Sequence, residues 1–178
     1  DVDCSDAEAA ARNAGWKTAV KRCLLTSAGG KSAGVAVGCR GHIGLRNSFV
    51  DEGLHECLSG RFTVKWVGAI CPGGIHCGSL YLHSSMGIRA KKNLDVLQAA
   101  GAVLKELKGP WIVGADFNCT PDDLRASGWL ELVGGEIVAP QASSCGGRTI
   151  DFFVVSRMIL HAVVSAHVIG DGLFSPHK

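Results

Sequence analysis

The 178-residue sequence lacks several patterns that would assign it to a specialised class of protein. Charged residues make up only 19% of it and aromatic residues 6%, and the formal net charge is +2. So few aromatic residues give no stacking platform for single-stranded nucleic acid, and so small a net charge limits any basic surface to a local patch. With 47% hydrophobic residues and 24 glycines, the composition is instead typical of a globular, loop-rich domain.

Segments that direct or anchor a protein are also missing from the sequence. No apolar run reaches the length of a membrane helix, and the first residues lack the basic and apolar sections of a secretory signal, so we expect no membrane partner. The chain begins with Asp1 rather than Met, which suggests processing or a longer parent. Without internal repeats or a low-complexity linker, residues 1–178 are predicted to form one single domain.

The eight cysteines form no Cys-x-x-Cys pair, and no histidine lies at the spacing of a zinc finger. Their even number is compatible with a disulfide framework. Cys23, Cys39 and Cys119 nevertheless lie in or beside apolar strands, which favours reduced, buried thiols. We therefore expect an intracellular protein, with the nucleus as one candidate compartment.

Hydrophobic periodicity predicts a mixed α/β chain. We expect helices over residues 6–14 and 93–107, and a short helix that Thr120 caps and Pro121 begins. Strands are predicted over residues 16–25, 33–39, 61–70, 76–83, 111–113, 149–156 and 162–169. This order implies mixed sheets covered by helices rather than a doubly wound parallel sheet.

One loop, at residues 27–32, ends in Gly30-Lys31-Ser32 and resembles a phosphate-binding loop. It lacks the preceding glycine at the required spacing, and it leads into a β-branched run rather than a helix. We therefore interpret it as the loop of a β-hairpin.

The most informative stretch follows the apolar run 111–113 and reads Gly114-Ala115-Asp116-Phe117-Asn118. Positions two apart on a strand point the same way, so Asp116 and Asn118 face one site while Phe117 turns into the core. Carboxylate and amide oxygens can bind a hard cation such as Mg2+ or orient a water. The simpler alternative is an Asx turn that closes the strand.

Three more polar residues end or interrupt apolar segments. His83 closes one strand, Asp151 lies in another, and His177 lies near the end of the chain. Taken singly, each has a structural explanation, as a satisfied loop histidine, a cap and a frayed terminus. Together with Asp116 and Asn118 they provide two imidazoles, two carboxylates and an amide, which is sufficient for metal-assisted phosphodiester hydrolysis.

The order of these motifs resembles the endonuclease/exonuclease/phosphatase superfamily of DNase I-like proteins, over nearly the whole chain. Within it, the chain is most similar to the endonuclease domains of non-LTR retrotransposons. The motifs are Leu82-His83-Ser84, the stretch from Gly114 to Asn118, Thr149-Ile150-Asp151-Phe152 and Ser175-Pro176-His177. The resemblance implies a four-layered sandwich of two β-sheets flanked by helices, truncated at both ends.

The same resemblance implies a role for each residue. Asp116 would orient or deprotonate the attacking water, and Asn118 would hold the scissile phosphate or the metal, so that both would bind Mg2+ or Mn2+. His83 would act on the phosphate or leaving oxygen, with Asp151 fixing its tautomer and raising its basicity. His177 would stabilise charge on the phosphorane.

Two departures from the family pattern predict a weakened metal site. The amino-terminal Asn and the Gln-Glu pair, whose Glu binds the metal, have no counterpart here. The family's Ser-Asp-His ending is Ser-Pro-His, with Pro176 in the place of the Asp. A hard cation therefore loses one or two carboxylate oxygens.

Basic residues near these motifs suggest a partner. Arg89, Lys91 and Lys92 follow His83, and Arg148 precedes the last motif, so Arg89, Lys92 and Arg148 are candidates for binding the phosphates of a DNA backbone. Plain surface charge is the alternative. Three functions remain open: a metal-dependent DNA endonuclease of a retroelement-type protein, a phosphatase acting on an inositol phosphate, phospholipid or nucleotide, and an inactive remnant.

Overall fold

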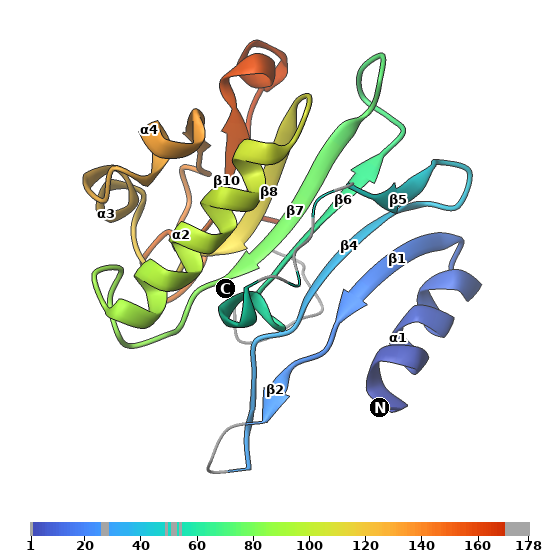
Figure 1. The fold of residues 1–178 in the computed structure, drawn as a ribbon, viewed down its shortest axis with the longest axis horizontal. Helices are drawn as coiled ribbons and strands as arrows, with labels where there is room; N and C mark the ends of the chain where they lie inside the picture. Colours follow the sequence, from blue (N-terminus) through green and yellow to red (C-terminus); the bar gives the residue numbers. More distant parts are fainter. Residues whose placement is uncertain (1, 26–28, 49, 51–52, 54, 170–178) are drawn as a thin grey trace.

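The structure is a computed structural model that describes residues 2–25, 29–48, 50, 53 and 55–169. Helices and strands are mixed along the chain. In space the largest sheet lies in the middle of the molecule (Figure 1). The amino-terminal elements are α1 (Val2–Asn13), β1 (Trp16–Lys21), β2 (Leu24–Leu25), β3 (Lys31–Ser32), β4 (Val35–Arg40), β5 (Leu45–Asn47) and the 3-10 helix η2 (Glu56–Leu58). The remaining ones are β6 (Phe62–Val67), β7 (Ile75–Tyr81), α2 (Lys91–Glu106), β8 (Trp111–Asp116), α3 (Pro121–Ala126), α4 (Trp129–Val133), β9 (Gly135–Val138), β10 (Asp151–Ser156) and the 3-10 helix η3 (Arg157–Ala162).

A six-stranded mixed sheet forms the centre of the molecule, in the order β5-β6-β7-β8-β10-β9. Only β7 and β8 are parallel, and α2 connects them across one face of the sheet (Figure 1). Apolar residues of α2, such as Val96 and Leu104, pack in the same core as Phe62 and Val113 of the sheet. The predicted mixed sheet covered by helices is therefore confirmed.

The opposite face of this sheet carries a second, smaller sheet, in which β1 and β4 are antiparallel. Val35, Val37 and Cys39 of β4 are buried, whereas the intervening residues are exposed. β4 contacts β6 and β7, and α1 packs against β1. The fold is thus a two-sheet sandwich, as predicted. Its layers are the helices on one face of the large sheet, the large sheet itself, the small sheet and α1.

Two predicted strands differ from the structure at matching positions. The strand predicted over residues 16–25 divides into β1 and β2, and the strand predicted over residues 33–39 begins only at Val35, as β4, after the separate strand β3. Between β3 and β4, Ala33 and Gly34 both have positive φ values, of 67° and 98°, which a continuous strand excludes. β2 and β3 pair antiparallel, so the hairpin interpretation of the Gly-Lys-Ser segment is confirmed; residues 26–28 of its loop lie outside the described residues.

The strand predicted over residues 162–169 is wrong. Residues 157–162 form η3, and residues 163–169 have no regular secondary structure. A strand needs a partner, but the outer edge of β10 is already occupied by β9, which the sequence analysis missed along with β5 and α4. The apolar residues of the segment are largely exposed instead, with Val164 at 97% and Ile169 at 82%.

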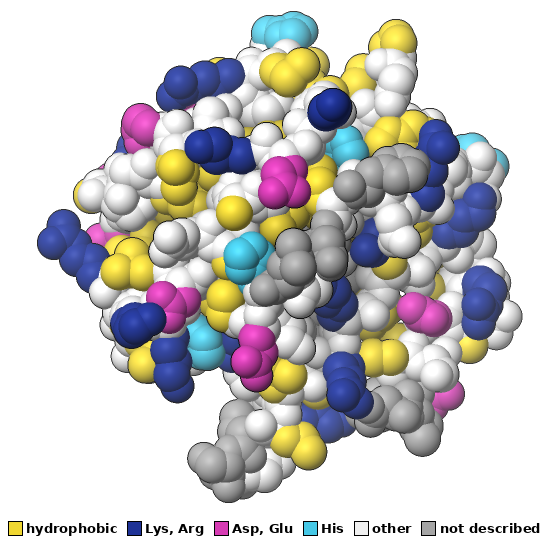
Figure 2. Space-filling model, in the orientation of Figure 1, with side chains coloured by type: hydrophobic (Ala, Val, Ile, Leu, Met, Phe, Trp, Pro, Cys, Tyr) yellow, Lys and Arg dark blue, Asp and Glu magenta, His cyan; other side chains and the backbone are white. Residues whose placement is uncertain are grey.

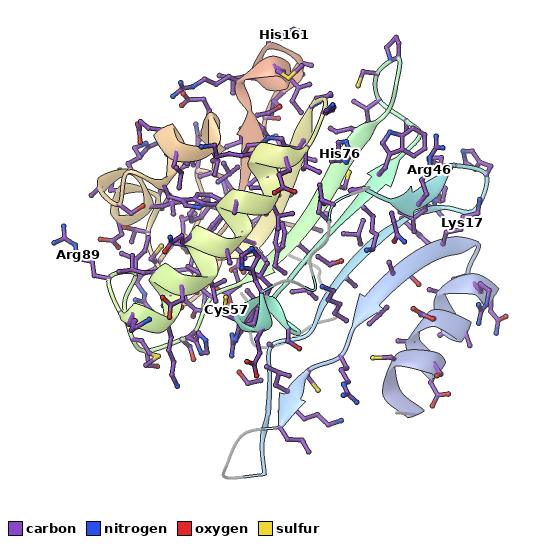
Figure 3. All side chains as sticks on the ribbon, viewed as in Figure 1. Lys17, Arg46, Cys57, His76, Arg89 and His161 are labelled. Carbon is purple, nitrogen blue, oxygen red and sulfur yellow. The ribbon has the colours of Figure 1, made fainter. Side chains whose placement is uncertain are left out.

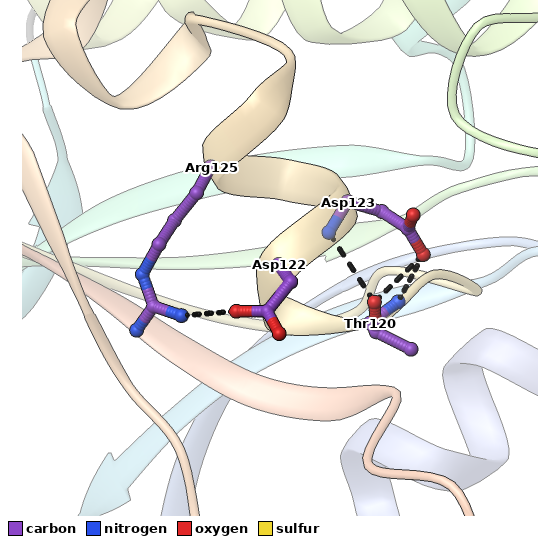
Figure 4. A network of polar contacts seen from close by, with 4 residues as sticks. All are labelled: Thr120, Asp122, Asp123 and Arg125. Carbon is purple, nitrogen blue, oxygen red and sulfur yellow. Dashed lines mark hydrogen bonds and ion pairs between the residues drawn. The ribbon is translucent and has the colours of Figure 1, made fainter.

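The predicted start of α3 is confirmed in detail (Figure 4). The Thr120 hydroxyl accepts a hydrogen bond from the Asp123 backbone N–H at 3.2 Å, and the Asp123 carboxylate accepts one from the Thr120 N–H at 3.1 Å. Asp122 pairs with Arg125 on the exposed side of the same helix at 2.7 Å. This capping box fixes the chain immediately after Asn118.

All eight cysteines are free, as predicted, with Cys39 and Cys119 buried and Cys23 half-buried. Burial raises the pKa of the Cys119 thiol to about 12 and that of Cys77 to about 11, so both thiols stay protonated at neutral pH. Over the described part of the chain, no helix combines the length and apolar character needed to cross a membrane.

Candidate functional site

The candidate site lies at the edge of the large sheet where β7 and β8 end and β10 begins. Because β7 and β8 are parallel, Tyr81 and Asp116 lie side by side at their carboxyl ends. β10 runs antiparallel to β8 and places Asp151 directly opposite Asp116. Both carboxylate residues line a groove of about 690 Å³ that also reaches Gly34 and the first residue of β4, Val35. The structure therefore brings the two predicted carboxylates together.

Asp116 and Asn118 are joined by the turn that the sequence suggested. The Asn118 backbone N–H donates to Asp116 Oδ1 at 2.9 Å, and Asn118 has a left-handed φ of 49°. The Asn118 side-chain amide donates to the Leu82 carbonyl at 2.9 Å, which fixes it beside the end of β7. Phe117 is fully buried and stacks on Phe152 with ring centroids 4.4 Å apart. The Asx turn thus positions the two polar residues.

His83 follows β7 and is held through its backbone by Asn93 from the first turn of α2. Asn93 Oδ1 accepts from the His83 N–H at 2.7 Å, and Asn93 Nδ2 donates to the carbonyls of His83 and Gly87 at 3.1 and 2.9 Å. Asn93 is only 1% exposed. The sequence analysis missed this residue, because an asparagine at the start of a helix is an ordinary cap in sequence.

The charges that act on His83 are both positive. Burial lowers the pKa of the His83 imidazole first, and the cations Arg61 and Lys92 lower it further. This direction is the opposite of the increase in basicity that we expected from Asp151. The imidazole is therefore kept neutral at pH 7, while the proposed pairing of His83 with Asp151 stays a prediction.

Arg61, at the start of β6, is a second residue that the sequence analysis missed. Its side chain is only 5% exposed, and its guanidinium donates to the Tyr81 carbonyl at 3.4 Å and to the Ser32 hydroxyl at 3.2 Å. The guanidinium carbon lies 5.7 Å from the centroid of the Tyr81 ring. Burial lowers the pKa of Arg61. A buried cation next to the ends of β6 and β7 raises the positive potential of this edge.

Two of the three predicted phosphate-binding residues meet on one side of the site. Arg89 and Arg148 line a pocket of about 570 Å³ together with Asn118 and Asp123. Arg89 extends away from the body of the molecule in the orientation of Figure 3, and its charge helps to lower the pKa of Asp123, after the hydrogen bonds from Thr120. Lys92 does not line this pocket, but its charge acts on His83.

His177 and Pro176 lie outside the described residues, so their predicted role stays a prediction. In the described part of the chain, no group of three or more His, Cys, Asp or Glu side chains is arranged to hold a metal ion. Asp116 and Asp151 nevertheless provide two carboxylates on neighbouring strands, and Asn118 provides an amide oxygen. Because Mg2+ commonly binds one or two carboxylates and completes its shell with waters and substrate phosphate, this donor set fits a cation shared with substrate.

Comparison with known proteins supports the DNase I-like arrangement. The structure of the human nocturnin catalytic domain matches with a TM-score of 0.60 at 12% identity, over 88% of this chain and 66% of that one. An AP endonuclease from Leishmania major matches with a TM-score of 0.60 at 14% identity, over 90% and 68%. ANGEL2, a 2',3'-cyclic phosphatase, matches with a TM-score of 0.54 at 13% identity, over 88% and 67%.

The chain thus spans about two thirds of the length of the structures that it matches. No curated protein sequence matches it significantly. A family profile, described as the endonuclease/exonuclease/phosphatase family, matches residues 1–177. The chain therefore belongs to the endonuclease/exonuclease/phosphatase family.

Proposed function

We propose that this chain hydrolyses phosphodiester bonds in DNA with the help of Mg2+ or Mn2+. The observation that carries the proposal is the position of Asn118, which is shared by two features of the site. It is hydrogen-bonded to Asp116, which lines the groove with Asp151, and it lines the pocket that contains Arg89 and Arg148. A phosphate held by the two guanidiniums lies beside the carboxylate that would activate water.

The charge of each side chain determines its proposed role in hydrolysis. Asp116 accepts a proton from, or orients, the attacking water, and Asn118 donates a hydrogen bond to the phosphate or offers its amide oxygen to the metal. Asp116 and Asn118 would hold the cation, which when bound would neutralise the charge that develops on the phosphoryl oxygens. His83 is neutral at pH 7, so it can accept a proton, and once it is an imidazolium it can give that proton to the leaving oxygen. Arg61 adds a fixed positive charge to the same edge.

Membership in a retroelement-type protein remains part of this proposal, supported by the motif order. The second candidate is a phosphatase, which the compact pocket with two arginines favours because it can hold a single terminal phosphate. The chain resembles ANGEL2, a 2',3'-cyclic phosphatase, in fold, and this likeness by itself does not extend to activity. An inactive remnant is the third candidate, because the family's amino-terminal metal ligands have no counterpart in the sequence.

The test is a nicking assay on supercoiled plasmid, with Mg2+ and with EDTA. Asp116→Asn keeps the shape of the side chain and the turn with Asn118 but removes the charge, so the nicking rate should fall at least ~100-fold, as expected for loss of an acid–base group. Asp122→Asn is the matched control, because Asp122 is exposed and pairs with Arg125 on the surface of α3. It should nick as fast as the unaltered chain.

The outcomes separate the three candidates. Nicking that needs Mg2+ and is lost in Asp116→Asn supports the endonuclease. Release of inorganic phosphate from a nucleotide or inositol phosphate, without nicking, supports the phosphatase. Absence of both activities from a chain that still binds DNA in EDTA identifies an inactive remnant, and equal nicking by Asp116→Asn refutes the proposed site.

A further inference from the structure

Positive and negative side chains are strongly separated along this chain. The 42 residues 9–50 contain seven Lys and Arg but no Asp or Glu, and residues 57–94 contain five more Lys and Arg and again no acidic residue. In the fold the first segment includes β1, β4 and β5, and the second includes β6, β7 and the start of α2. A net charge of +2 therefore hides two long segments without acidic residues, and Figure 2 shows many Lys and Arg side chains on its right side.

Two arginines of the first segment lie over tryptophan rings. The Arg40 guanidinium carbon lies 4.4 Å from the ring centroid of Trp16, which is its partner in the β1–β4 pairing. The Arg46 guanidinium carbon lies 3.8 Å from the ring centroid of Trp66, its partner in the β5–β6 pairing. Both arginines are exposed. A cation–π contact restricts the arginine side chain, and the guanidinium keeps its charge and its N–H donors.

The loop between β4 and β5 brings the two pairs to one rim, which we call the far rim (Arg40, Arg46 and Lys17). The Gly41 N–H donates to the Gly15 carbonyl at 2.7 Å, and the Gly68 N–H donates to the Gly44 carbonyl at 2.8 Å. Lys17 Nζ donates to the Ile43 carbonyl in this loop at 3.0 Å. Figure 3 shows Lys17 and Arg46 at the same end of the sheets.

The far rim is separate from the candidate catalytic edge. β4 begins with Val35, which lines the groove containing Asp116, and ends with Arg40. β6 begins beside the end of β7 and runs away from it to Trp66 and Val67. The far rim and the candidate catalytic edge therefore lie at opposite ends of the same strands. Among the described residues, no carboxylate forms an ion pair with Arg40 or Arg46.

We propose that the far rim binds the phosphate backbone of a nucleic acid, as a second contact outside the catalytic edge. Guanidiniums that are already oriented lose little conformational freedom when they bind phosphate, and phosphates recur along a backbone at intervals that several cations can share. An anionic membrane fits less well, because both indoles are already covered by guanidiniums and Trp66 donates its N–H to the Gly73 carbonyl at 2.9 Å. The proposal does not depend on catalysis.

The test measures binding of a short labelled DNA duplex by fluorescence anisotropy at increasing salt. It uses the full chain with Asp116→Asn, in EDTA, so that no cleavage occurs. Each phosphate contact contributes about 0.9 to the slope of log affinity against log salt, so Arg40→Gln with Arg46→Gln should lower that slope by ~2. At 0.1 M salt the affinity should fall by at least about tenfold.

Arg125→Gln with Arg157→Gln is the matched control. It removes the same charge from exposed arginines that are already paired with Asp122 and Glu136. This variant should keep the slope, and Arg40→Lys with Arg46→Lys should keep most of it, which separates charge from any loss of folding. The proposal is refuted if the glutamine pair and the control behave alike, or if the glutamine pair loses binding only to anionic phospholipid vesicles. Failure to nick plasmid would leave the slopes unchanged and would count against the catalytic site alone.

Discussion

Replacing Asn93 by alanine should destabilise the chain because this side chain connects α2 to the end of β7. Its amide makes three hydrogen bonds, to the N–H and carbonyl of His83 and to the carbonyl of Gly87, and it is 1% exposed. Each bond contributes about 1 kcal/mol net, and a buried group left without a partner costs more, so the loss is about 3–5 kcal/mol. That is a large part of the roughly 5–15 kcal/mol that stabilises a typical domain.

The assay is urea unfolding followed by circular dichroism, with Gln98→Ala as the control on the exposed face of the same helix. Asn93→Asp should lose less than the alanine variant, because it keeps the acceptor for the His83 N–H and places a negative charge at a helix start. The nicking rate should also fall, since His83 loses its fixed position. If Asn93→Ala and Gln98→Ala unfold at the same urea concentration, the hydrogen bonds of Asn93 do not stabilise the fold as proposed.

Two further predictions concern the pKa of His83 and the packing of one glycine. The pKa of His83 is lowered from 6.5, so the folded chain binds fewer protons than the unfolded chain as the pH falls below 6.5. The contribution of His83 to the free energy of unfolding is therefore present above pH 6.5 and is lost as the pH falls. The free energy of unfolding should depend less on pH in His83→Gln. Arg61→Gln should raise the pKa of His83, measured by NMR titration of the imidazole; an unchanged value would contradict the coupling. Gly74→Ala should lower the free energy of unfolding by about 2–4 kcal/mol, because the new Cβ would lie 2.5 Å from the Trp66 ring at a φ of +79°. Gly73→Ala is the control, because its Cβ would meet open space, and it should lower the free energy of unfolding by about 1–2 kcal/mol. Urea unfolding measures both.

The elements that could be predicted from the sequence are those with a repeated apolar pattern. Residues 93–107 and 76–83 were predicted within two residues of α2 and β7 at each end, because burial on one face repeats along them. The capped start of α3 was also predictable, since Thr120, Pro121 and Asp123 act through local hydrogen bonds and backbone geometry. Local chemistry and periodicity are both properties of a short segment.

Features that depend on distant neighbours could not be predicted in this way. The pattern of residues 162–169 is apolar enough for a strand, but whether it becomes one depends on a free sheet edge, and Gly135–Val138 had already occupied that edge. Arg61 likewise reads as an ordinary first residue of the strand predicted over residues 61–70. Its burial follows from the approach of Ser32 and Tyr81, which lie 29 and 20 positions away.

This long-range packing also changes the chemistry expected of the site. Sequence reasoning pairs a catalytic histidine with a carboxylate, because such a pair raises its basicity. Here burial, Arg61 and Lys92 all act in the other direction on His83. A neutral imidazole beside fixed cations suits a site whose substrate brings the negative charge, because the approaching phosphate replaces the missing carboxylate and raises the imidazole pKa only when it is bound. His83 would then become a stronger proton acceptor only when substrate is bound.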